Sequence, residues 1–410
     1  MTEYDRILDL PEFKVIKAHF SKKKIVFNIQ SIHDKRECPI CKNVSDKIHS
    51  YFIQPLRDLS SINRLVYLEL KRHKLFCKKC KKIFTERFAA IEYKHIYTTR
   101  FEIDIFFSCF ERSFSSVSRS EQIPYDCVRG IFGRYSRASV EYLKKFDKTV
   151  RIIGLDEISI KKGHNDFQTI ISNINEGYVM EVLPDRKQET IVKYLKNLPK
   201  TAKETIIYAS IDMWEGYFNA IQRVLKKTTI VIDRFHVMKN LNFAITKYRR
   251  KIQKYLPKEL KDRYKGYRWI LVKNEENMTE QQLLQLSEMK KNCPELKRVY
   301  NLRKEFQDIF NRETSIRKAR KKIALWEKKI EALKDDDLNT FIKTLHNWKK
   351  WILNYFSSGK VTNGFVEGMN NRIKLIKRIG YGYNNKNNFR LRVLAECGYG
   401  KLKKSKSLFF

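Results

Sequence analysis

Three acidic residues stand where their carboxylates could bind a divalent metal ion. Asp156 lies within the apolar run GLDEISI, and Asp212 directly follows the apolar run TIIYASI. An aspartate among apolar strand residues is costly to bury unless it is paired or bound to a metal ion. Glu367 comes much later, in TNGFVEGMNNRIK, where cap-forming residues begin a predicted helix. Hard oxygen donors from two strands and a helix predict a divalent-cation site that aligns phosphoryl groups.

The predicted helix around Glu367 has a polar side and an apolar side. Glu367, Asn370, Asn371 and Lys374 follow the spacing i, i+3, i+4 and i+7, so they share one side. The apolar side consists of Phe365, Met369, Ile373 and Ile376. We expect the apolar side to pack on a sheet, and the polar side to present the carboxylate together with DNA-binding amides and a cation. The simpler alternative is an ordinary amphipathic helix.

A fourth acid competes with Asp212 for the second position in the site. Asp233 ends the run TTIVI and is followed closely by Arg234 and His236. The fold order inferred below places the second carboxylate after the fourth strand, which favours Asp212. Asp233 would then pair with Arg234 or His236 or support the site indirectly, and for His236 packing or hydrogen bonding is favoured over metal ligation. Glu157 points to the opposite face of its strand, so we predict no catalytic role for it.

The segments around these acids alternate between strand and helix patterns. Runs RIIGLDEISI, FQTIISNI and YVMEVL, separated by KKGHND and NEG, predict three antiparallel strands. A helix over about 187–197, a strand over 205–211, a helix over 215–226 and a strand over 228–232 follow. This α/β order is that of an RNase H-like core, in which acids occupy the first strand and the end of the fourth. For each aspartate alone, capping of the turn after its strand is the simpler alternative.

Four of the eight cysteines form two identical pairs, Cys38 with Cys41 and Cys77 with Cys80. Two intervening residues let both thiolates face one ion, and two such turns complete a tetrahedral structural zinc site. The strand-like runs SYFIQ and LVYLEL between the pairs suit a zinc ribbon. A pair of disulfides or four unrelated core cysteines are the alternatives. The other cysteines lie singly among apolar residues and are predicted to pack in the core: Cys109, Cys127, Cys293 and Cys397.

Basic residues gather in and beside the second cysteine pair. Lys78 and Lys79 lie inside it. Further cations flank the pair at Lys71, Arg72, Lys74, Lys81 and Lys82. This concentration predicts that the ribbon contacts DNA, although a merely solvated surface would have the same composition.

Residues 99–145 have a helical pattern with a polar break at 118–122. Two short helices joined by a tight turn resemble a helix-turn-helix. The second helix, over about 124–138, would offer three arginines to a DNA groove. These arginines are Arg129, Arg134 and Arg137. Any three-helix core would show a similar pattern.

More than a hundred residues between Asp233 and Glu367 exceed what a minimal core needs. They are helical in pattern and rich in Lys and Arg, which predicts an all-α insertion. One apolar stripe comprises Ile316, Ile323, Trp326, Ile330 and Leu333. The insertion's basic faces could hold DNA ends or stack on unpaired bases through Trp269, Trp326, Trp348 and Trp351. Core packing is favoured for these tryptophans, and the basic tail over 378–406 is predicted to contact phosphates.

The net charge of +39 on a chain that is 42% hydrophobic excludes a disordered basic tail. The charge is uneven: residues 1–150 carry +12, residues 151–237 carry +2 and residues 238–410 carry +25. Two basic regions flanking a nearly neutral one favour nucleic acid as the partner. A membrane surface is the rival partner, but no apolar run approaches the about 18 residues of a spanning helix. The start MTEYDRILDL lacks the features of a signal peptide, so we expect a cytosolic protein.

Five motifs in this order resemble one known family over nearly the whole chain. They are the doubled CxxC, GLDEISIKKGHNDFQT, SIDMWEGY, VIDRFHVMKNLN and TNGFVEGMNNRIKLIKRIGYGY. Together they resemble the DDE transposases of the ISL-three group of bacterial insertion sequences. The resemblance implies an RNase H-like domain that binds two Mg²⁺ ions, with Mn²⁺ as the alternative ion, through Asp156, Asp212 and Glu367. It also implies a structural Zn²⁺ and a helix-turn-helix ahead of that domain.

The resemblance further implies an enzyme that binds the terminal inverted repeats of its insertion sequence. Its expected substrates are the double-stranded DNA of the transposon ends and of the target, and its expected reactions are DNA cleavage and strand transfer. A homo-oligomer is expected, with a dimer favoured because two ends must be brought together, and its place is the bacterial cytoplasm, on the nucleoid. The rivals are an RNase H-like nuclease or resolvase and a domesticated DNA-binding regulator without catalysis. Serine or tyrosine recombinase chemistry is disfavoured, because no nucleophile stands beside a matching basic constellation. The presence of all three acids argues against the regulator.

These inferences divide the chain into five parts. The predicted parts are a zinc-binding module over 1–90, a helix-turn-helix domain over 91–148, the first part of the RNase H-like core over 149–238, a helical insertion over 239–358, and the last part of the core with the basic tail over 359–410.

Overall fold

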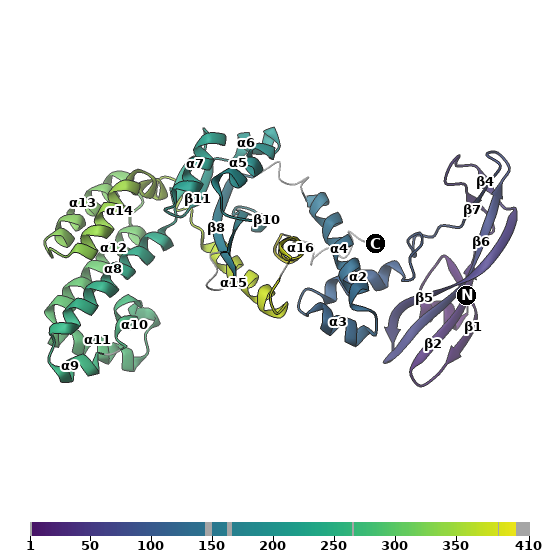
Figure 1. The fold of residues 1–410 in the computed structure, drawn as a ribbon, viewed down its shortest axis with the longest axis horizontal. Coiled ribbons are helices and arrows are strands. Elements are labelled where there is room, and N and C mark those ends of the chain that lie inside the picture. Colours follow the sequence, from purple (N-terminus) through teal and green to yellow (C-terminus); the bar gives the residue numbers. More distant parts are fainter. Residues whose placement is uncertain (1, 144–149, 162–165, 265, 384, 399–410) are drawn as a thin grey trace. The chain divides into compact units, whose positions relative to one another are not determined.

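The computed structural model describes residues 2–143, 150–161, 166–264, 266–383 and 385–398. These residues form two compact units that divide between Ala138 and Ser139, called here the N-terminal and the C-terminal unit (Figure 1). Among the described helices, none combines the length and apolarity needed to cross a membrane.

The N-terminal unit contains a five-stranded sheet. Its strands are β1 (Phe13–Phe20), β2 (Lys24–Ser31), β5 (Ile48–Ser61), β6 (Arg64–Cys77) and β7 (Lys82–Thr85), preceded by helix α1 (Glu3–Leu8). The order is β1-β2-β6-β5, with β7 pairing on β6, and only β2 and β6 run parallel. The runs SYFIQ and LVYLEL lie in β5 and β6, which confirms them as strands, whereas β1 and β2 were not predicted.

Three helices follow the sheet in the region predicted to be helical. They are α2 (Thr99–Ser108), α3 (Phe114–Glu121) and α4 (Tyr125–Leu143). Thr98 and Ser113 cap the first two, each accepting a hydrogen bond from a backbone N–H in the first turn. Gln122 ends α3 in the left-handed conformation with φ of 55°, so only a short turn separates α3 from α4.

The C-terminal unit is built on a second five-stranded sheet. Its strands are β8 (Ile152–Lys161), β9 (Asp166–Asn173), β10 (Tyr178–Val182), β11 (Tyr208–Ile211) and β12 (Thr229–Ile232). The spatial order is β10-β9-β8-β11-β12; β9 runs antiparallel to both of its neighbours, and β11 runs parallel to both β8 and β12. The predicted turn at residues 162–165 lies outside the described residues.

Three helices connect the strands of this sheet. They are α5 (Gln188–Asn197), α6 (Lys200–Thr205) and α7 (Glu215–Val224). Helices α5 and α7 match the predicted helices to within a few residues. Helix α6 was not predicted, and it delays the start of the following strand from residue 205 to Tyr208.

The long segment after β12 is entirely helical in its described residues, as predicted. Its helices are α8 (Arg234–Tyr255), α9 (Lys258–Arg263), α10 (Arg268–Val272), α11 (Glu280–Asn292), α12 (Pro294–Arg312), α13 (Ile316–Glu331) and α14 (Asp336–Leu353), with the short 3-10 turns η2 (Glu275–Asn277) and η3 (Asn354–Phe356). In Figure 1 they extend from the sheet on the side of β11. Helix α8 begins directly after Asp233, five residues before the predicted boundary of the insertion.

The sheet and the helical segment share one apolar core. Trp326 lies fully buried in it, against the rings of Phe306 and Phe341, and its indole N–H donates to the backbone carbonyl of Leu302 at 2.7 Å. Trp348 and Trp351 pack against the same core, which confirms the favoured interpretation for these three tryptophans. For Trp269 that interpretation is wrong, because 62% of this residue is exposed.

Two final helices return to the sheet. Helix α15 (Gly364–Ile379) contacts β8, and α16 (Lys386–Cys397) contacts β10. The buried residues of α15 are Val366, Asn370, Ile373 and Ile376. The predicted apolar side is therefore partly wrong: Phe365 and Met369 are only half-buried, and the polar Asn370 is buried in their place.

Replacing Trp326 by alanine should strongly destabilise the C-terminal unit. The change removes a large buried ring and leaves a cavity, which typically lowers the free energy of unfolding by about 3–5 kcal/mol. Differential scanning calorimetry should therefore show a lower Tm, whereas Leu325→Ala, at the exposed neighbouring position, should leave the Tm nearly unchanged. Equal melting temperatures for the two variants would contradict the shared core.

Candidate metal centre and nucleic-acid interface

Three aspartates lie in one row across three neighbouring strands. Asp156 lies in β8, and Asp212 and Asp233 directly follow β11 and β12. The parallel pairing of β11 with β8 and β12, continued to the strand ends, places Asp212 beside both other aspartates. The pairing of these three strands thus brings together acids that are far apart in the chain.

His236 links two of these aspartates from the first turn of α8. Its Nδ1 atom lies 2.6 Å from Oδ1 of Asp212 and 3.3 Å from Oδ2 of Asp233. Asp233 is only 2% exposed and also accepts a hydrogen bond from the backbone N–H of Asn363 at 3.1 Å. Of the two partners predicted for Asp233, the structure supplies His236, whereas Arg234 donates to the Tyr355 hydroxyl and to Asn311.

Asp156 is held from two sides. The side-chain amide of Asn370 donates to its Oδ2 atom at 2.5 Å, and the backbone N–H of Glu157 donates to its Oδ1 atom at 2.7 Å. The carboxylate of Glu157 pairs with Arg186 at 2.8 Å. Asn370, predicted as a DNA contact, therefore contacts the first aspartate in this structure.

Gly154 lets helix α15 approach the strand that carries Asp156. A Cβ atom at this position would lie 2.8 Å from Cγ2 of Val366 and 3.0 Å from Oδ1 of Asn363. Real Cβ atoms essentially never come so close to other heavy atoms, so only glycine fits without a shift of α15. The packing of α15 on Gly154 sets the place of Glu367 and Asn370 relative to Asp156.

A cavity of about 520 Å³ opens over the row of aspartates. Its charged lining consists of Asp156, Glu157, Asp212, Asp233, His236, Lys239, Glu367, Lys374 and Lys377. Glu367 is exposed in the first turn of α15. Among the described residues, ligand atoms of Asp156, Asp212 and His236 lie within 4.8 Å of one another; Glu367 lines the same cavity outside that set.

Burial makes the negative charges of this cluster unfavourable. Burial and the neighbouring Asp212 raise the pKa of Asp156 to about 6, and burial also raises the pKa of Asp212. Burial lowers the pKa of His236, but the carboxylates of Asp212 and Asp233 outweigh it and raise that pKa to about 10. One protonated histidine beside three aspartates leaves an excess of negative charge that a divalent cation would neutralise.

The donor atoms of the cavity fit such a cation. Carboxylate oxygens are hard ligands of the kind that Mg²⁺ and Mn²⁺ prefer. The side-chain oxygens of Asn363 and Asn370 are buried and have no hydrogen-bond partner in the part of the chain that the structure describes, so they could accept a bond from a water of a hydrated ion. Lys374 is exposed at the cavity, whereas Asn371 is exposed on α15 and does not belong to the lining.

The four predicted zinc ligands come together in the N-terminal unit. The Sγ atoms of Cys38 and Cys80 are 3.6 Å apart, and those of Cys41 and Cys77 are 3.5 Å apart, close to the ~3.8 Å edge of a tetrahedral site with Zn–S bonds of about 2.3 Å. All four are free thiols whose ligand atoms lie within 4.8 Å of one another. The backbone N–H groups of Cys41 and Cys80 lower the pKa values of Cys38 and Cys77, which favours their metal-binding thiolates, whereas burial raises the pKa of Cys80.

The basic residues predicted to contact DNA in this unit differ in their surroundings. Lys78 and Lys79 are exposed in the ribbon, whereas Arg72 is buried and donates to the backbone carbonyl of Glu86. Arg72 therefore supports the sheet and does not form part of the basic surface.

The three arginines of α4 also differ. Arg137 is exposed, and Arg129 pairs with Asp126 at 3.0 Å on the surface. Arg134 donates to the buried carboxylate of Glu102 at 2.7 Å, a bond that ties α4 to α2.

Sequence reasoning missed the contributions of Gly154 and Asn363, and it ranked His236 below its place in the cluster. The signal for His236 was present in the sequence, because Asp233 and His236 are three residues apart at the start of a helix and so face the same side. No comparable local signal marks Gly154 or Asn363. Their roles depend on the contact between β8 and the start of α15, which lie more than two hundred residues apart in the chain.

The C-terminal unit has a carboxylate-lined cavity that fits a divalent cation, on a mixed sheet flanked by helices. The N-terminal unit has a cluster of four cysteines that fits a structural zinc ion. The two features together are typical of a metal-dependent enzyme with a zinc module. The family model of the ISL3-group DDE transposases matches residues 153–393, which is more than half of the chain. A second profile, the zinc-finger of the transposases of IS204, IS1001, IS1096 and IS1165, matches residues 34–80. The chain belongs to the ISL3-group DDE transposases, which confirms the resemblance inferred from its motifs.

Individual relatives agree with this assignment. The transposase of insertion sequence element IS1001 from Bordetella parapertussis is 27% identical over 370 residues, which cover 87% of this chain and 88% of the relative. The transposase of IS1557 from Mycobacterium tuberculosis is 24% identical over 267 residues, covering 58% of this chain and 59% of the relative. The protein is therefore an enzyme of DNA transposition that cuts DNA and transfers strands, and DNA is its substrate.

Mutation of a cluster cysteine should remove zinc from the N-terminal unit. Purified protein should contain about one zinc ion per chain by elemental analysis, and Cys77→Ser should lose it, because a structural site needs all four ligands. Cys127→Ala lies outside the cluster and should keep the zinc. A zinc content that Cys77→Ser leaves unchanged would contradict the site.

Gly154→Val should impair strand transfer although it removes no carboxylate. The branched side chain would push α15 away from β8 and so separate Glu367 and Asn370 from Asp156. We expect a loss of at least about tenfold in strand transfer, on the scale of misplaced catalytic groups. Gly368→Ala is the matched control, since a Cβ atom there would meet nothing within 4 Å. Equal activities of the two variants would show that the close packing is dispensable.

Proposed function

We propose that this transposase binds the terminal inverted repeats of its insertion sequence and cuts and joins DNA through Asp156, Asp212 and Glu367, which together hold Mg²⁺, with Mn²⁺ as the alternative. The observation that carries the proposal is the shared cavity, which collects acids from β8, from the end of β11 and from α15. Its place of action is the bacterial nucleoid.

The sheet supports an RNase H-like core. Its order β10-β9-β8-β11-β12, with β9 antiparallel and β8, β11 and β12 parallel, agrees with the order of strands and helices expected for that fold. Asp156 in the first strand of this sheet and Asp212 after the fourth occupy the positions that such a core uses for metal ligands.

Asp212 suits the second position better than Asp233. Asp233 is buried, and its two oxygens already accept from the Asn363 backbone and contact His236. Asp212 is only partly buried and lies beside Asp156 in the register of the sheet. Asp233 therefore acts as a support that holds His236 and the start of α15.

The protein's own groups have distinct tasks in phosphoryl transfer. Asp156, Asp212 and Glu367 would hold a divalent ion, which would supply activation of the attacking hydroxyl group and neutralisation of charge on the phosphate. Asn370 orients Asp156, and His236 forms an ion pair with Asp212 at 2.6 Å. The ammonium groups of Lys239 and Lys374 line the cavity, where they attract and position the DNA phosphates.

The remaining parts of the chain are assigned to holding DNA. The zinc ribbon of residues 1–90 contacts DNA through Lys78 and Lys79, and residues 91–148 form a helix-turn-helix in which α4 enters a groove. The exposed Arg137 is the strongest candidate there, since Arg134 is engaged by Glu102. The catalytic core spans 149–238 and 359–410, interrupted by the helical insertion, and two copies of the chain join two ends as a dimer. The part of the basic tail at residues 399–406 lies outside the described residues.

Substitution of single acids distinguishes the proposed metal ligands from Asp233, which only supports the site. The full-length protein, labelled DNA of the element's own ends and a target plasmid are incubated with Mg²⁺ or with chelator, and cleaved and joined products are resolved on gels. Asp156→Asn, Asp212→Asn and Glu367→Gln should each lower the rate by about 10³-fold or more, because each removes a metal ligand. Asp233→Asn should retain measurable Mg²⁺-dependent activity.

The outcomes of this assay distinguish the candidate functions. Cleavage without joining would indicate a nuclease or resolvase, and shifted but intact DNA would indicate a regulator without catalysis. If Asp233→Asn abolished the reaction while Asp212→Asn left it intact, Asp233 would be the second acid. In every variant, DNA binding should fall steeply with added salt, as it does for the wild-type protein. This result would show that the acids do not act through affinity for DNA.

A further inference from the structure

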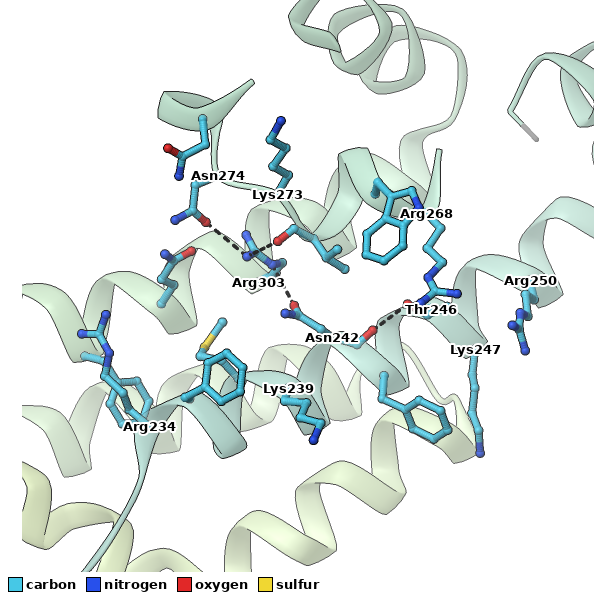
Figure 2. A pocket seen from close by; sticks show the side chains of 18 residues that line it. Arg234, Lys239, Asn242, Thr246, Lys247, Arg250, Arg268, Lys273, Asn274 and Arg303 are labelled. Atoms are coloured by element: carbon cyan, nitrogen blue, oxygen red, sulfur yellow. Dashed lines mark hydrogen bonds between the residues drawn. The ribbon is translucent and has the colours of Figure 1, made fainter. Parts of the chain in front are cut away.

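A second cavity lies within the helical insertion. It has a volume of about 710 Å³ and is lined by residues of α8, α10 and α12 and of the segment between α10 and α11. Seven lysine and arginine side chains line it, all labelled in Figure 2, and none of its lining residues is acidic. We call this cavity the basic groove.

Much of the positive charge in the basic groove is not neutralised by the protein. Arg250 and Arg268 take part in none of the ion pairs formed among the described residues, whereas Lys239 also lines the acidic catalytic cavity with Asp212. Lys247 pairs with Asp337 at 3.1 Å, outside the lining. An uncompensated cluster of this kind attracts a polyanion.

Exposed aromatic rings accompany these cations. Phe243 and Trp269 are both 62% exposed, and Phe235 is 45% exposed. The guanidinium of Arg268 lies 4.5 Å from the Trp269 ring centre, and the ammonium of Lys247 lies 5.0 Å from the Phe243 ring centre. Phosphate binding needs only cations, so exposed rings beside them indicate a ligand that also has flat apolar faces.

A buried arginine fixes the walls of the basic groove. Arg303 on α12 donates to the side chain of Asn242 on α8 at 2.8 Å, to the backbone carbonyl of Val272 on α10 and to the side chain of Asn274 at 3.2 Å. Figure 2 shows these bonds converging on Arg303 from three segments. The arrangement of rings and cations is therefore supported by the fold and does not depend on surface chains alone.

The basic groove continues into the catalytic cavity. Phe235 and Lys239 line both cavities, and α8 begins directly after Asp233. Along α8 the lining residues run from Arg234 to Arg250, a distance of about 24 Å at 1.5 Å per residue. A chain that leaves the metal site along α8 would enter the basic groove.

We propose that the basic groove holds unpaired nucleotides of the DNA strand next to the reacting phosphate, with bases stacked on Trp269 and Phe243 and phosphates bound by Lys239, Arg250 and Arg268. The proposal rests on the function proposed above, because it places that phosphate in the catalytic cavity. Bases in a duplex stack on one another and hide their faces, so the exposed rings match unpaired bases. The volume also falls in the ~300–1,000 Å³ range of pockets for small ligands, which suits one or two nucleobases.

The test measures binding of single-stranded DNA by the full-length protein without metal, so it needs no catalysis. The probe is a fluorescently labelled oligothymidylate of about 15 nucleotides, followed by anisotropy. Trp269→Ala should weaken binding roughly 5- to 100-fold, the loss expected for one stacked base. Trp269→Tyr should restore most of the affinity, and Tyr255→Ala, an exposed aromatic on α8 outside the lining, should bind like the wild-type protein.

Charge is tested with a matched pair of variants. Arg250→Ala should weaken binding of the oligonucleotide and reduce its salt dependence, whereas Lys321→Ala, an exposed cation on α13 outside the lining, should change neither. Wild-type affinity in Trp269→Ala, or equal effects of the Arg250 and Lys321 variants, would overturn the basic groove as a DNA site.

The same variants distinguish failure of this inference from failure of the proposed function. If the wild-type protein joins DNA ends with Mg²⁺ but Trp269→Ala binds the oligonucleotide normally, only the inference fails. If the wild-type protein shows no metal-dependent reaction, the proposed function fails, whatever the oligonucleotide binding. With both correct, Trp269→Ala should be slowed on fully paired ends and recover when the bases beside the cleavage site are mismatched.

Discussion

The fold of the C-terminal unit places three acidic side chains in one row across neighbouring strands of its sheet, although their negative charges repel one another: Asp156, Asp212 and Asp233. Burial raises the pKa of Asp156 and of Asp212, and the protonated His236 compensates only part of their charge. Such a cluster is unfavourable for stability alone, because repulsion and desolvation both oppose it. A divalent cation would reverse the sign of the interaction, because each carboxylate would then face a positive charge.

The other elements hold this arrangement or bring DNA to it. The close packing of α15 on Gly154 places Asn370 against Asp156 and Glu367 at the cavity. The core around Trp326 joins the helical insertion to the sheet, so the cations of α8 keep a fixed place beside the acids. The chain thus gathers several carboxylates in one cavity although its net charge is +39.

Much of this could be predicted from the sequence, because strand alternation and strand ends are local properties. The positions of Asp156 and Asp212, the four zinc ligands and the helical nature of the insertion followed from such patterns. The buried side of α15 was partly mispredicted. The periodicity of apolar residues does not show which side of the helix will pack against Gly154, because that residue is far away in the chain. Strand β1 was missed because a bulge between Val15 and Lys17 interrupts its period of two, and the exposure of Trp269 depends on which helices cover α10.

The central claim is that the row of aspartates is a divalent-cation site. Anomalous diffraction from crystals of the full-length protein soaked in Mn²⁺ tests it directly. The account predicts a manganese peak in contact with the carboxylates of both Asp156 and Asp212, which disappears in Asp156→Asn. A peak bound to Asp233 and His236 without Asp156, or no peak in the cavity at saturating Mn²⁺, would contradict it.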